Sequence, residues 1–313
     1  MGVKTSVFAS NSERRNFYNL EHTWGKKYKL YHNLPFLNIF NTENLVDLSD
    51  IYNIVPLVIE EIDVNRLKKT SIDYTLCDEN DKPIISIDFD GMQDGFNVGD
   101  KYYTGKTASL SSPWRRQITE LKLKVARGSL FPYFVVGYKQ FKEISTESKL
   151  TIVDGIIGEV ISQKKVQEEV DNFNVDKLNI SEEEFNELSP ADKHEYIQNW
   201  LMDIEITADY ENNPIIKRRW NLEKDLIVRN QSIIPLSYPK IEPDDKNWYM
   251  SLILHGHRVI FHTEDLGDIE AEAWLPYFNM PGFSGLGLTE DIAALIALEK
   301  IIFQREKKHI KTK

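Results

Sequence analysis

Three aspartates stand where two neighbouring segments of the chain are expected to pair as β-strands. Asp73 lies in the segment 71–76, and Asp88 and Asp90 lie at the end of the segment 83–89. Because side chains alternate along a strand, Asp88 and Asp90 share a face, and pairing of the strands brings Asp73 towards them. Carboxylates this close repel one another unless a hard cation neutralises them. Mg²⁺ or Mn²⁺ suits oxygen ligands of this kind, so the spacing predicts a metal site at this edge of the sheet.

A metal ion at these carboxylates would activate water and stabilise negative charge on a phosphoryl group. A basic segment begins at Trp114, and Lys122 or a neighbouring base in it would place a positive charge beside the phosphorus. Its arginines could hold a phosphate backbone. The candidate nucleic-acid contacts of this segment are Arg115, Arg116, Gln117 and Lys124. A simpler interpretation stays open, in which the aspartates are exposed strand ends and the basic segment is a solvated helix.

The residues around the aspartates predict the elements that position them. The run Asp78-Glu79-Asn80-Asp81 is typical of a turn, so the segments on either side of it are expected to form a hairpin. A polar loop with several glycines follows over 91–112, and then a helix over 114–126 that ends near Gly128. An aromatic and β-branched strand over 131–138 closes this part of the chain.

The segment before the hairpin has apolar residues at helix-like intervals. They predict a helix over 41–61 with a kink or boundary at Pro56. Its apolar stripe consists of Leu45, Leu48, Ile51, Val55 and Val58. Glu60 and Glu61 would end this helix, either as further acids of the site or as a solvated helix end.

The part of the chain after the expected strands is predicted to be helical and acidic. Ser181 and Ser189, the latter followed by a proline, have the sequence context of helix starts. One or two strands are expected over 248–261. A last helix is expected from 290 to about 307, with Thr289 as its cap.

Four short motifs follow one another along the first half of the chain. They are Asp73-Tyr74, Ile85-Ser86-Ile87-Asp88-Phe89-Asp90-Gly91-Met92-Gln93, Glu120-Leu121-Lys122 and Pro132-Tyr133-Phe134-Val135-Val136. Their order resembles the PD-(D/E)XK nuclease superfamily, and within it the branch that includes the very-short-patch-repair endonucleases. That branch has an acid on one strand, an acid-x-Asp-Gly at the end of the next, a polar stretch, a helix that contains Lys, and a closing strand.

The resemblance implies a role for each matching residue. Asp73 and Asp88 would be the metal-binding acids, with Mg²⁺ or Mn²⁺ as the cofactor. Asp90 would occupy the third position of the (D/E)XK element, and the lysine role would have moved to Lys122 on the helix. The implied fold is α/β, with a restriction-endonuclease-like mixed sheet flanked by helices. The implied activity is metal-dependent hydrolysis of phosphodiester bonds, in DNA, for defence or DNA processing.

Two positions depart from the pattern of that branch. A His usually follows the Asp-Gly pair within a few residues, and Asp94 stands at that position here. Thr119 stands three residues before Lys122, where an Asp is common. A catalytically inactive protein of the same fold, which binds DNA or joins a complex, therefore remains open as the alternative function.

Charge is unevenly distributed along the 313 residues, whose 49 acidic and 38 basic side chains give a formal net charge of -11. Over 111–150, eight basic and three acidic side chains give +5, whereas over 159–210 four basic and fourteen acidic side chains give -10. The total excludes a protein that coats nucleic acid with a uniformly basic surface, and leaves a small metal-centred site untouched. We interpret the acidic segment as a solvated helical face, with contact to a protein partner as the alternative.

Length and composition indicate a globular protein of more than one part. We divide the chain into a nuclease-like core with an N-terminal extension over 1–150, an acidic helical segment over 151–213, and an α+β portion over 214–313. No apolar run approaches the roughly 20 residues that span a bilayer, and the first residues lack the pattern of a secretory signal. The single cysteine, Cys77, fits a reducing compartment, so we expect a cytoplasmic protein without a membrane partner.

Three other groups of residues have the types that a functional site uses. His255 and His257 share an expected strand face, with His262 further on, but no carboxylate is spaced to complete a metal site. The triplet 217–219 is basic and either contacts nucleic acid or belongs to the ordinary surface, which we favour. The segment 282–287 contains three glycines but no Walker lysine, and is interpreted as a tight, packed turn.

Overall fold

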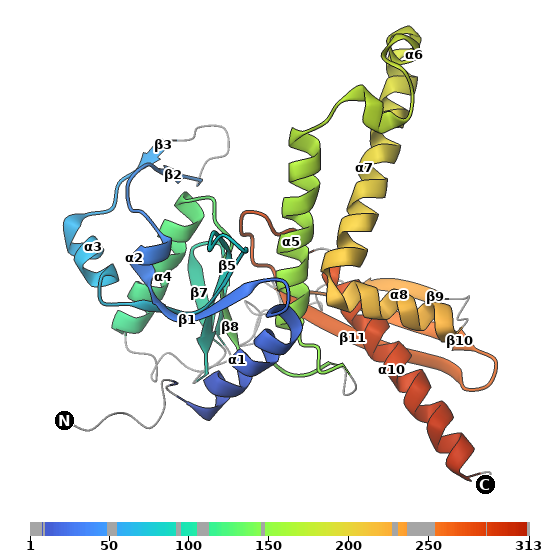
Figure 1. Ribbon diagram of the computed structural model, residues 1–313. Coiled ribbons are helices and arrows are strands. Elements are labelled where there is room, and N and C mark those ends of the chain that lie inside the picture. The colour runs from blue at the N-terminus through green and yellow to red at the C-terminus, as the bar shows by residue number, and fades with distance from the viewer. Residues whose placement is uncertain are drawn as a thin grey trace, which may run out of the picture.

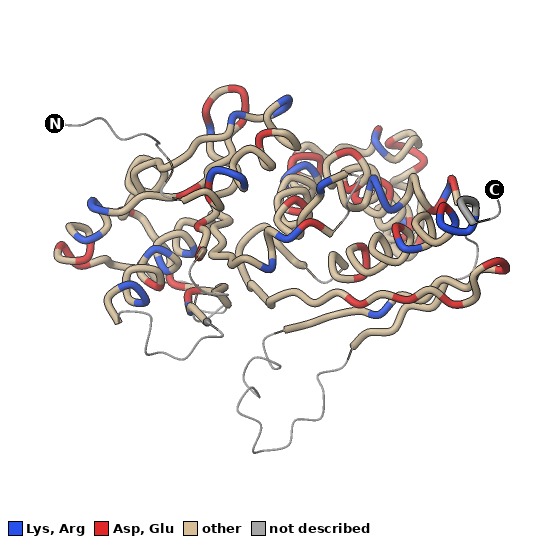
Figure 2. Tube along the Cα trace, turned by 90° about the horizontal axis from the view of Figure 1, so that it is seen from below, with Lys and Arg blue, Asp and Glu red and all other residues tan. Residues whose placement is uncertain are grey.

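The computed structural model describes residues 8, 10–48, 55–91, 95–104, 113–144, 148–226, 231–236, 254–285 and 287–311 (Figure 1). A four-stranded sheet and its helices form one side of the molecule, and a three-stranded sheet with the C-terminal helix forms the other. A single hydrophobic cluster extends from Leu20 to Ile301, so the three portions of the chain share one core. Basic and acidic residues are interspersed along the trace on both sides (Figure 2).

The four-stranded sheet has the order β1-β4-β5-β8. Its strands are β1 (Lys29–Pro35), β4 (Ser71–Cys77), β5 (Pro83–Asp90) and β8 (Tyr133–Gly137). The first three pair antiparallel, and β8 runs parallel to β5. The predicted hairpin of β4 and β5 is confirmed, and so is the α/β class with a mixed sheet flanked by helices.

Helices lie against both faces of this sheet. The crossover helix α4 (Pro113–Gly128) buries Ile118, Lys122 and Leu123, and it lies on the face that carries Asp88, because Lys122 contacts that carboxylate. Helix α1 (Asn11–Trp24) lies on the opposite face, where Tyr74 donates a hydrogen bond to the backbone oxygen of Glu13. The carboxylate face of the sheet is therefore the one on which the basic helix lies.

The predicted helix over 41–61 is wrong. Its described residues include two short antiparallel strands, β2 (Leu45–Asp47) and β3 (Val55–Leu57), and Ile51 lies outside the described part of the chain. The β-branched residues of this segment favour strands, and Asn44 adopts a left-handed conformation (φ 59°) that no helix interior has. Helix α2 (Phe36–Ile39) precedes the pair, and α3 (Glu61–Leu67) follows it, so Glu60 and Glu61 begin a helix and do not end one.

A second short hairpin lies in the predicted polar loop over 91–112. Strands β6 (Gly95–Val98) and β7 (Lys101–Thr104) pair there, and they bring Phe96 and Tyr102 into the core. The loop prediction is therefore wrong for these residues, while 92–94 and 105–112 lie outside the described part of the chain.

The acidic portion forms an arm that projects from the body (Figure 1). Helices α5 (Ile152–Asp171) and α7 (Pro190–Asn212) run side by side, and the 3-10 helix η1 (Val175–Leu178) and α6 (Glu182–Glu187) connect them. The predicted starts at Ser181 and Ser189 are confirmed, because each hydroxyl accepts a hydrogen bond from a backbone N–H of its helix. The first half of α5 is buried in the core, and its second half belongs to the arm.

The described residues of the C-terminal portion form a sheet and two helices. Helix α8 (Pro214–Leu226) leads to the sheet β11-β10-β9, made of β9 (Gln231–Leu236), β10 (Leu254–Thr263) and β11 (Gly267–Pro276). The strand predicted over 248–261 is thus found from Leu254, and 248–253 lie outside the described residues. Helix α10 (Leu288–Lys311) begins one residue before Thr289, the predicted cap. None of the described helices is both long and apolar enough to cross a bilayer.

Candidate active site

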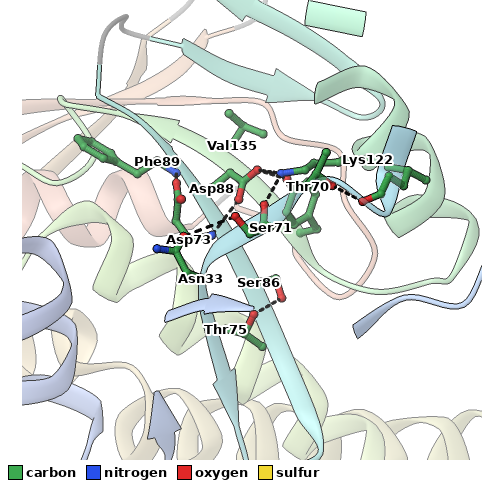
Figure 3. Close-up of polar contacts among 12 residues, drawn as sticks. Asn33, Thr70, Ser71, Asp73, Thr75, Ser86, Asp88, Phe89, Lys122 and Val135 are labelled. Carbon is green, nitrogen blue, oxygen red and sulfur yellow. Dashed lines mark hydrogen bonds and ion pairs between the residues drawn. The ribbon is translucent and has the colours of Figure 1, made fainter. Parts of the chain in front are cut away.

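The candidate site lies where β4 and β5 stop pairing through their backbones. The last backbone pairs of this ladder end at Tyr74 opposite Ile87. At the next position Asp73 N donates to Asp88 Oδ1 (3.1 Å), and Phe89 N donates to Asp73 Oδ2 (2.7 Å) (Figure 3). Side-chain oxygens thus replace the backbone acceptors of the ladder. The exchange fixes the two carboxylates opposite each other at the strand ends.

Lys122 reaches this pair from α4 (Figure 3). Its Nζ lies 2.6 Å from Asp88 Oδ2 and 2.6 Å from the backbone oxygen of Ser71, with only 9% of the side chain exposed. Tyr133 of β8 donates its hydroxyl to the same Asp88 oxygen at 2.5 Å. A buried ammonium needs such partners because it has lost its water. Strands β4, β5 and β8 and the crossover helix α4 therefore meet at the Asp88 carboxylate.

Burial and the Asp88 charge raise the pKa of Asp73 to about 7, burial being the larger cause. The hydrogen bond from Phe89 N and the positive charge of Lys122 act in the opposite direction. Burial likewise holds the pKa of Tyr133 well above its usual value, so its hydroxyl remains a donor to Asp88. Near neutral pH, Asp73 is therefore poised between its neutral and charged forms, as expected of a carboxylate that lacks a positive partner of its own.

The donor set of this site fits a divalent cation. Among the described residues, none donates a hydrogen bond to Asp73 Oδ1, so this oxygen can bind a further ligand. A pocket of about 200 Å³ adjoins both carboxylates, and Ser71, Asp90, Arg115 and Thr119 are among its lining residues. The described residues contain no cluster of three His, Cys, Asp or Glu side chains, so a cation here would complete its shell with water.

Asp90, the predicted third acid, lies in the same pocket but is engaged elsewhere. It is on the face of β5 that Asp88 occupies, as the alternation of the strand predicts. Its side chain, 4% exposed, accepts hydrogen bonds from Tyr102 and from Arg115 (3.2 Å). Asp90 therefore orients Arg115 at the pocket.

The predicted nucleic-acid contacts of α4 fall into two groups. Arg115 lines the carboxylate pocket. Arg116 is exposed and pairs with Glu120 (3.3 Å). Gln117 and Lys124 are exposed and line a neighbouring groove of about 460 Å³, which shares Trp114 and Ile118 with the carboxylate pocket. Arg116, Gln117 and Lys124 thus do not line the carboxylate pocket itself.

Two residues that contact the aspartates of the site are assigned no role by the sequence analysis. Tyr133 and Tyr102 both donate to the aspartates, from β8 and β7. Tyr133 stands in the expected closing strand, and the parallel register that places it near Asp88 depends on tertiary structure. Asp94, at the usual His position, lies outside the described residues.

The other candidate groups have structural partners. His255 contacts Gly285 O (2.8 Å) and His257 contacts Thr289 Oγ1 (2.7 Å), so the two histidines bind different chain groups. The interpretation of the triplet 217–219 as surface is wrong for Arg219, which is buried and pairs with Glu223, Glu290 and Asp291. The turn at 282–285 is packed as predicted, and its backbone N–H groups at Ser284 and Gly285 donate to Glu159.

The site as a whole combines two facing carboxylates, a buried ammonium, and a guanidinium held at the pocket. This combination can bind a cation and, beside it, a phosphate group. No family model, curated protein or solved structure matches the chain.

Proposed function

We propose that the chain is a metal-dependent nuclease with a restriction-endonuclease-like core, and that it hydrolyses phosphodiester bonds in DNA. The observation that carries this proposal is the meeting of Asp73, Asp88 and Lys122 at one pocket. Each comes from a different element, and Asp73 and Lys122 are far apart in the sequence. A convergence of two acids and a buried lysine suits chemistry at a phosphate.

The arrangement of the elements supports the same proposal. The two acids lie on adjacent antiparallel strands, the lysine lies on the following helix, and β8 completes the sheet beside the second acid. This is the order of parts that the resemblance to PD-(D/E)XK nucleases implies. The departures at Thr119 and Asp94 leave the pair of acids and the lysine in place.

Asp73 and Asp88 would hold Mg²⁺ or Mn²⁺. When bound, the cation supplies an activated water and positive charge at the scissile phosphate. Lys122 adds a second positive charge that is fixed before the substrate arrives, since Asp88 and Ser71 O already orient its ammonium. Arg115, oriented by Asp90, binds a phosphate oxygen at the pocket.

Cleavage assays with Mg²⁺ or Mn²⁺ on plasmid, linear and single-stranded DNA and on RNA test the proposal. We expect Asp88→Asn to lower the cleavage rate at least about 100-fold, because the metal loses a charged ligand and Lys122 loses its partner. The matched control is Asp225→Asn, an exposed aspartate of α8, which should cleave as the wild type does. Full Mg²⁺-dependent cleavage by a folded Asp88→Asn protein would show that the assignment is wrong.

One observation favours a second function, a non-catalytic nucleic-acid-binding or complex-forming protein. Asp88 already accepts hydrogen bonds from Lys122 and Tyr133, and Asp90 from Tyr102 and Arg115. These carboxylates are therefore satisfied by the chain itself. DNA binding that is insensitive to EDTA, without any cleavage product in Mg²⁺ or Mn²⁺, would support this function over the first.

A further inference from the structure

A second pocket lies on the other side of Phe89 from the carboxylates. It has a volume of about 570 Å³ and is formed by one turn of α1 and by the segment that follows β8. The residues that line it are Arg15, Asn19, Tyr138, Lys139, Phe141, Lys142 and Glu143. None of them has a part in the metal site described above.

This pocket is basic although the chain as a whole is acidic. Three of its lining side chains are basic and one is acidic, while the formal net charge of the chain is -11. Arg15 and Lys142 are both exposed. A concave surface with a positive excess attracts a polyanion in preference to an apolar or cationic ligand.

The pocket also presents an aromatic ring in a fixed orientation. Tyr138 is 43% exposed, and its hydroxyl forms a hydrogen bond with Ser12 Oγ (2.7 Å). The guanidinium of Arg15 lies 6.0 Å from the centre of the Tyr138 ring. A ring that is held at one end and open to solvent is a platform on which a nucleic-acid base can stack. Cations beside such a ring suit the phosphates on either side of that base.

Phe89 lies beside both sites, with its backbone at the carboxylates and its ring on the other face of β5, towards the second pocket. The backbone N–H of Phe89 donates to Asp73 Oδ2. Its ring centre lies 5.7 Å from that of Tyr138 and 5.2 Å from that of Phe141. A strand with a phosphate at the carboxylates therefore reaches Tyr138 by passing around the end of β5 at Asp90.

We propose that this second pocket binds an unpaired nucleotide of the strand whose phosphate lies at Asp73 and Asp88. The inference rests on the proposed nuclease function, and it specifies single-stranded nucleic acid as the form that is bound. Stacking needs an exposed base face, which a duplex does not offer. The ring and the cations recognise base and phosphate, which DNA and RNA share, so the pocket accepts single strands of either kind.

Equilibrium binding of short fluorescent oligonucleotides in EDTA tests this inference without any cleavage. Single-stranded DNA, single-stranded RNA and duplex DNA form the three arms. We expect Tyr138→Leu to weaken the binding of both single strands about tenfold, whereas Tyr138→Phe, which keeps the ring, binds nearly as the wild type does. Arg15→Ala should weaken binding and lower the salt dependence by about one counterion.

Tyr196→Leu is the matched control, because Tyr196 on α7 is similarly exposed (39%) and lies on the acidic arm. Thermal melting establishes that each variant is folded. The inference is overturned if Tyr138→Leu binds as tightly as the wild type, if Tyr196→Leu loses as much affinity, or if only duplex DNA is bound.

The same proteins separate the two proposals. Single-strand binding that depends on Tyr138, combined with no cleavage in Mg²⁺ or Mn²⁺, would overturn the nuclease function and retain the pocket. Metal-dependent cleavage that Asp88→Asn abolishes, with Kd and KM unchanged in Tyr138→Leu, would overturn the pocket alone.

Discussion

Lys122 is the residue on which the candidate site depends most. Its ammonium binds Asp88 and the backbone oxygen of Ser71, and its Nζ lies 5.8 Å from the ring centre of Phe36. The side chain thus joins α4 to β4 and β5. Because these contacts exist without substrate, the positive charge at the pocket is oriented in advance, which is where fixed charges contribute most to catalysis.

Replacing this ammonium by an apolar chain of similar length tests its structural role. We expect Lys122→Met to lower the free energy of unfolding by about 3 kcal/mol, because Asp88 is left as a largely buried carboxylate without its cation. Urea unfolding measures the change. Lys124→Met, two residues further along α4 and exposed, is expected to stay within about 0.5 kcal/mol of the wild type.

A double-mutant cycle with Asp88→Asn isolates the interaction itself. In Lys122→Met the Asp88 carboxylate keeps its charge but loses its cation, and Asp88→Asn removes that charge. The double variant should therefore lose less stability than the sum of the two single variants. Strict additivity of the two substitutions would contradict a direct ion pair between Lys122 and Asp88.

At the scale of elements, alternation and turn residues were sufficient to predict the hairpin of β4 and β5 and the shared face of Asp88 and Asp90. They failed for 41–61, where the intervals between Leu45, Val55 and Val58 fit a helix but the side chains are not packed as one. Leu45 is buried, but Val55 is 42% and Val58 80% exposed, so these described members of the stripe do not share one buried face. A periodic pattern predicts an element only where tertiary contacts bury it.

The parts of the site that the sequence does not predict depend on tertiary register. Tyr102 reaches Asp90 from β7, a strand of only four residues (Lys101–Thr104) within a segment that resembles a loop. Tyr133 reaches Asp88 because β8 pairs in parallel with β5, in a register that places Tyr133 opposite Ser86. The alternation along a single strand predicts which of its side chains share a face, but it does not predict which other elements contact that face.

The docking of α4 on the sheet is the element-scale feature that positions Lys122. Leu123, the next residue, is fully buried (0% exposed) in the core. We expect Leu123→Ala to lower the free energy of unfolding by about 2–5 kcal/mol, because the cavity it leaves cannot close completely. Leu130→Ala, at a site that is 59% exposed after the helix, should change stability by less than about 0.5 kcal/mol. Equal effects of the two substitutions in urea unfolding would contradict this docking.

At the scale of the whole molecule, buried acids recur in each portion of the chain. Burial is the main cause in each case: it raises the pKa of Asp73 to about 7, of Glu159 to about 7 and of Asp291 to about 6. Each group binds its proton more tightly in the folded than in the unfolded chain. Its contribution to stability is therefore complete below the unfolded pKa near 4 and is lost as pH rises through the folded pKa. Stability is expected to decrease from about pH 5 to pH 7.5.

Glu159 gives the clearest test of this dependence, because it lies on α5 between the portions of the chain and away from the candidate site. Its carboxylate accepts hydrogen bonds from Ser284 N (3.2 Å) and Gly285 N (2.6 Å), which a glutamine oxygen can also accept. Glu159→Gln should therefore fold, and it should remove about 2 kcal/mol of the wild-type loss of stability between pH 5.5 and pH 7.5.

Urea unfolding at these two pH values measures the difference. Glu195→Gln, on the exposed surface of α7, should keep the wild-type pH dependence because its carboxylate faces solvent in both states. An unchanged pH dependence in Glu159→Gln would show that this carboxyl ionises as easily in the folded chain as in the unfolded one. If the expected result is found, Glu159, where the arm meets the body, is protonated in the folded chain at mildly acidic pH. Its contribution to the free energy of unfolding is then larger there than at pH 7.5.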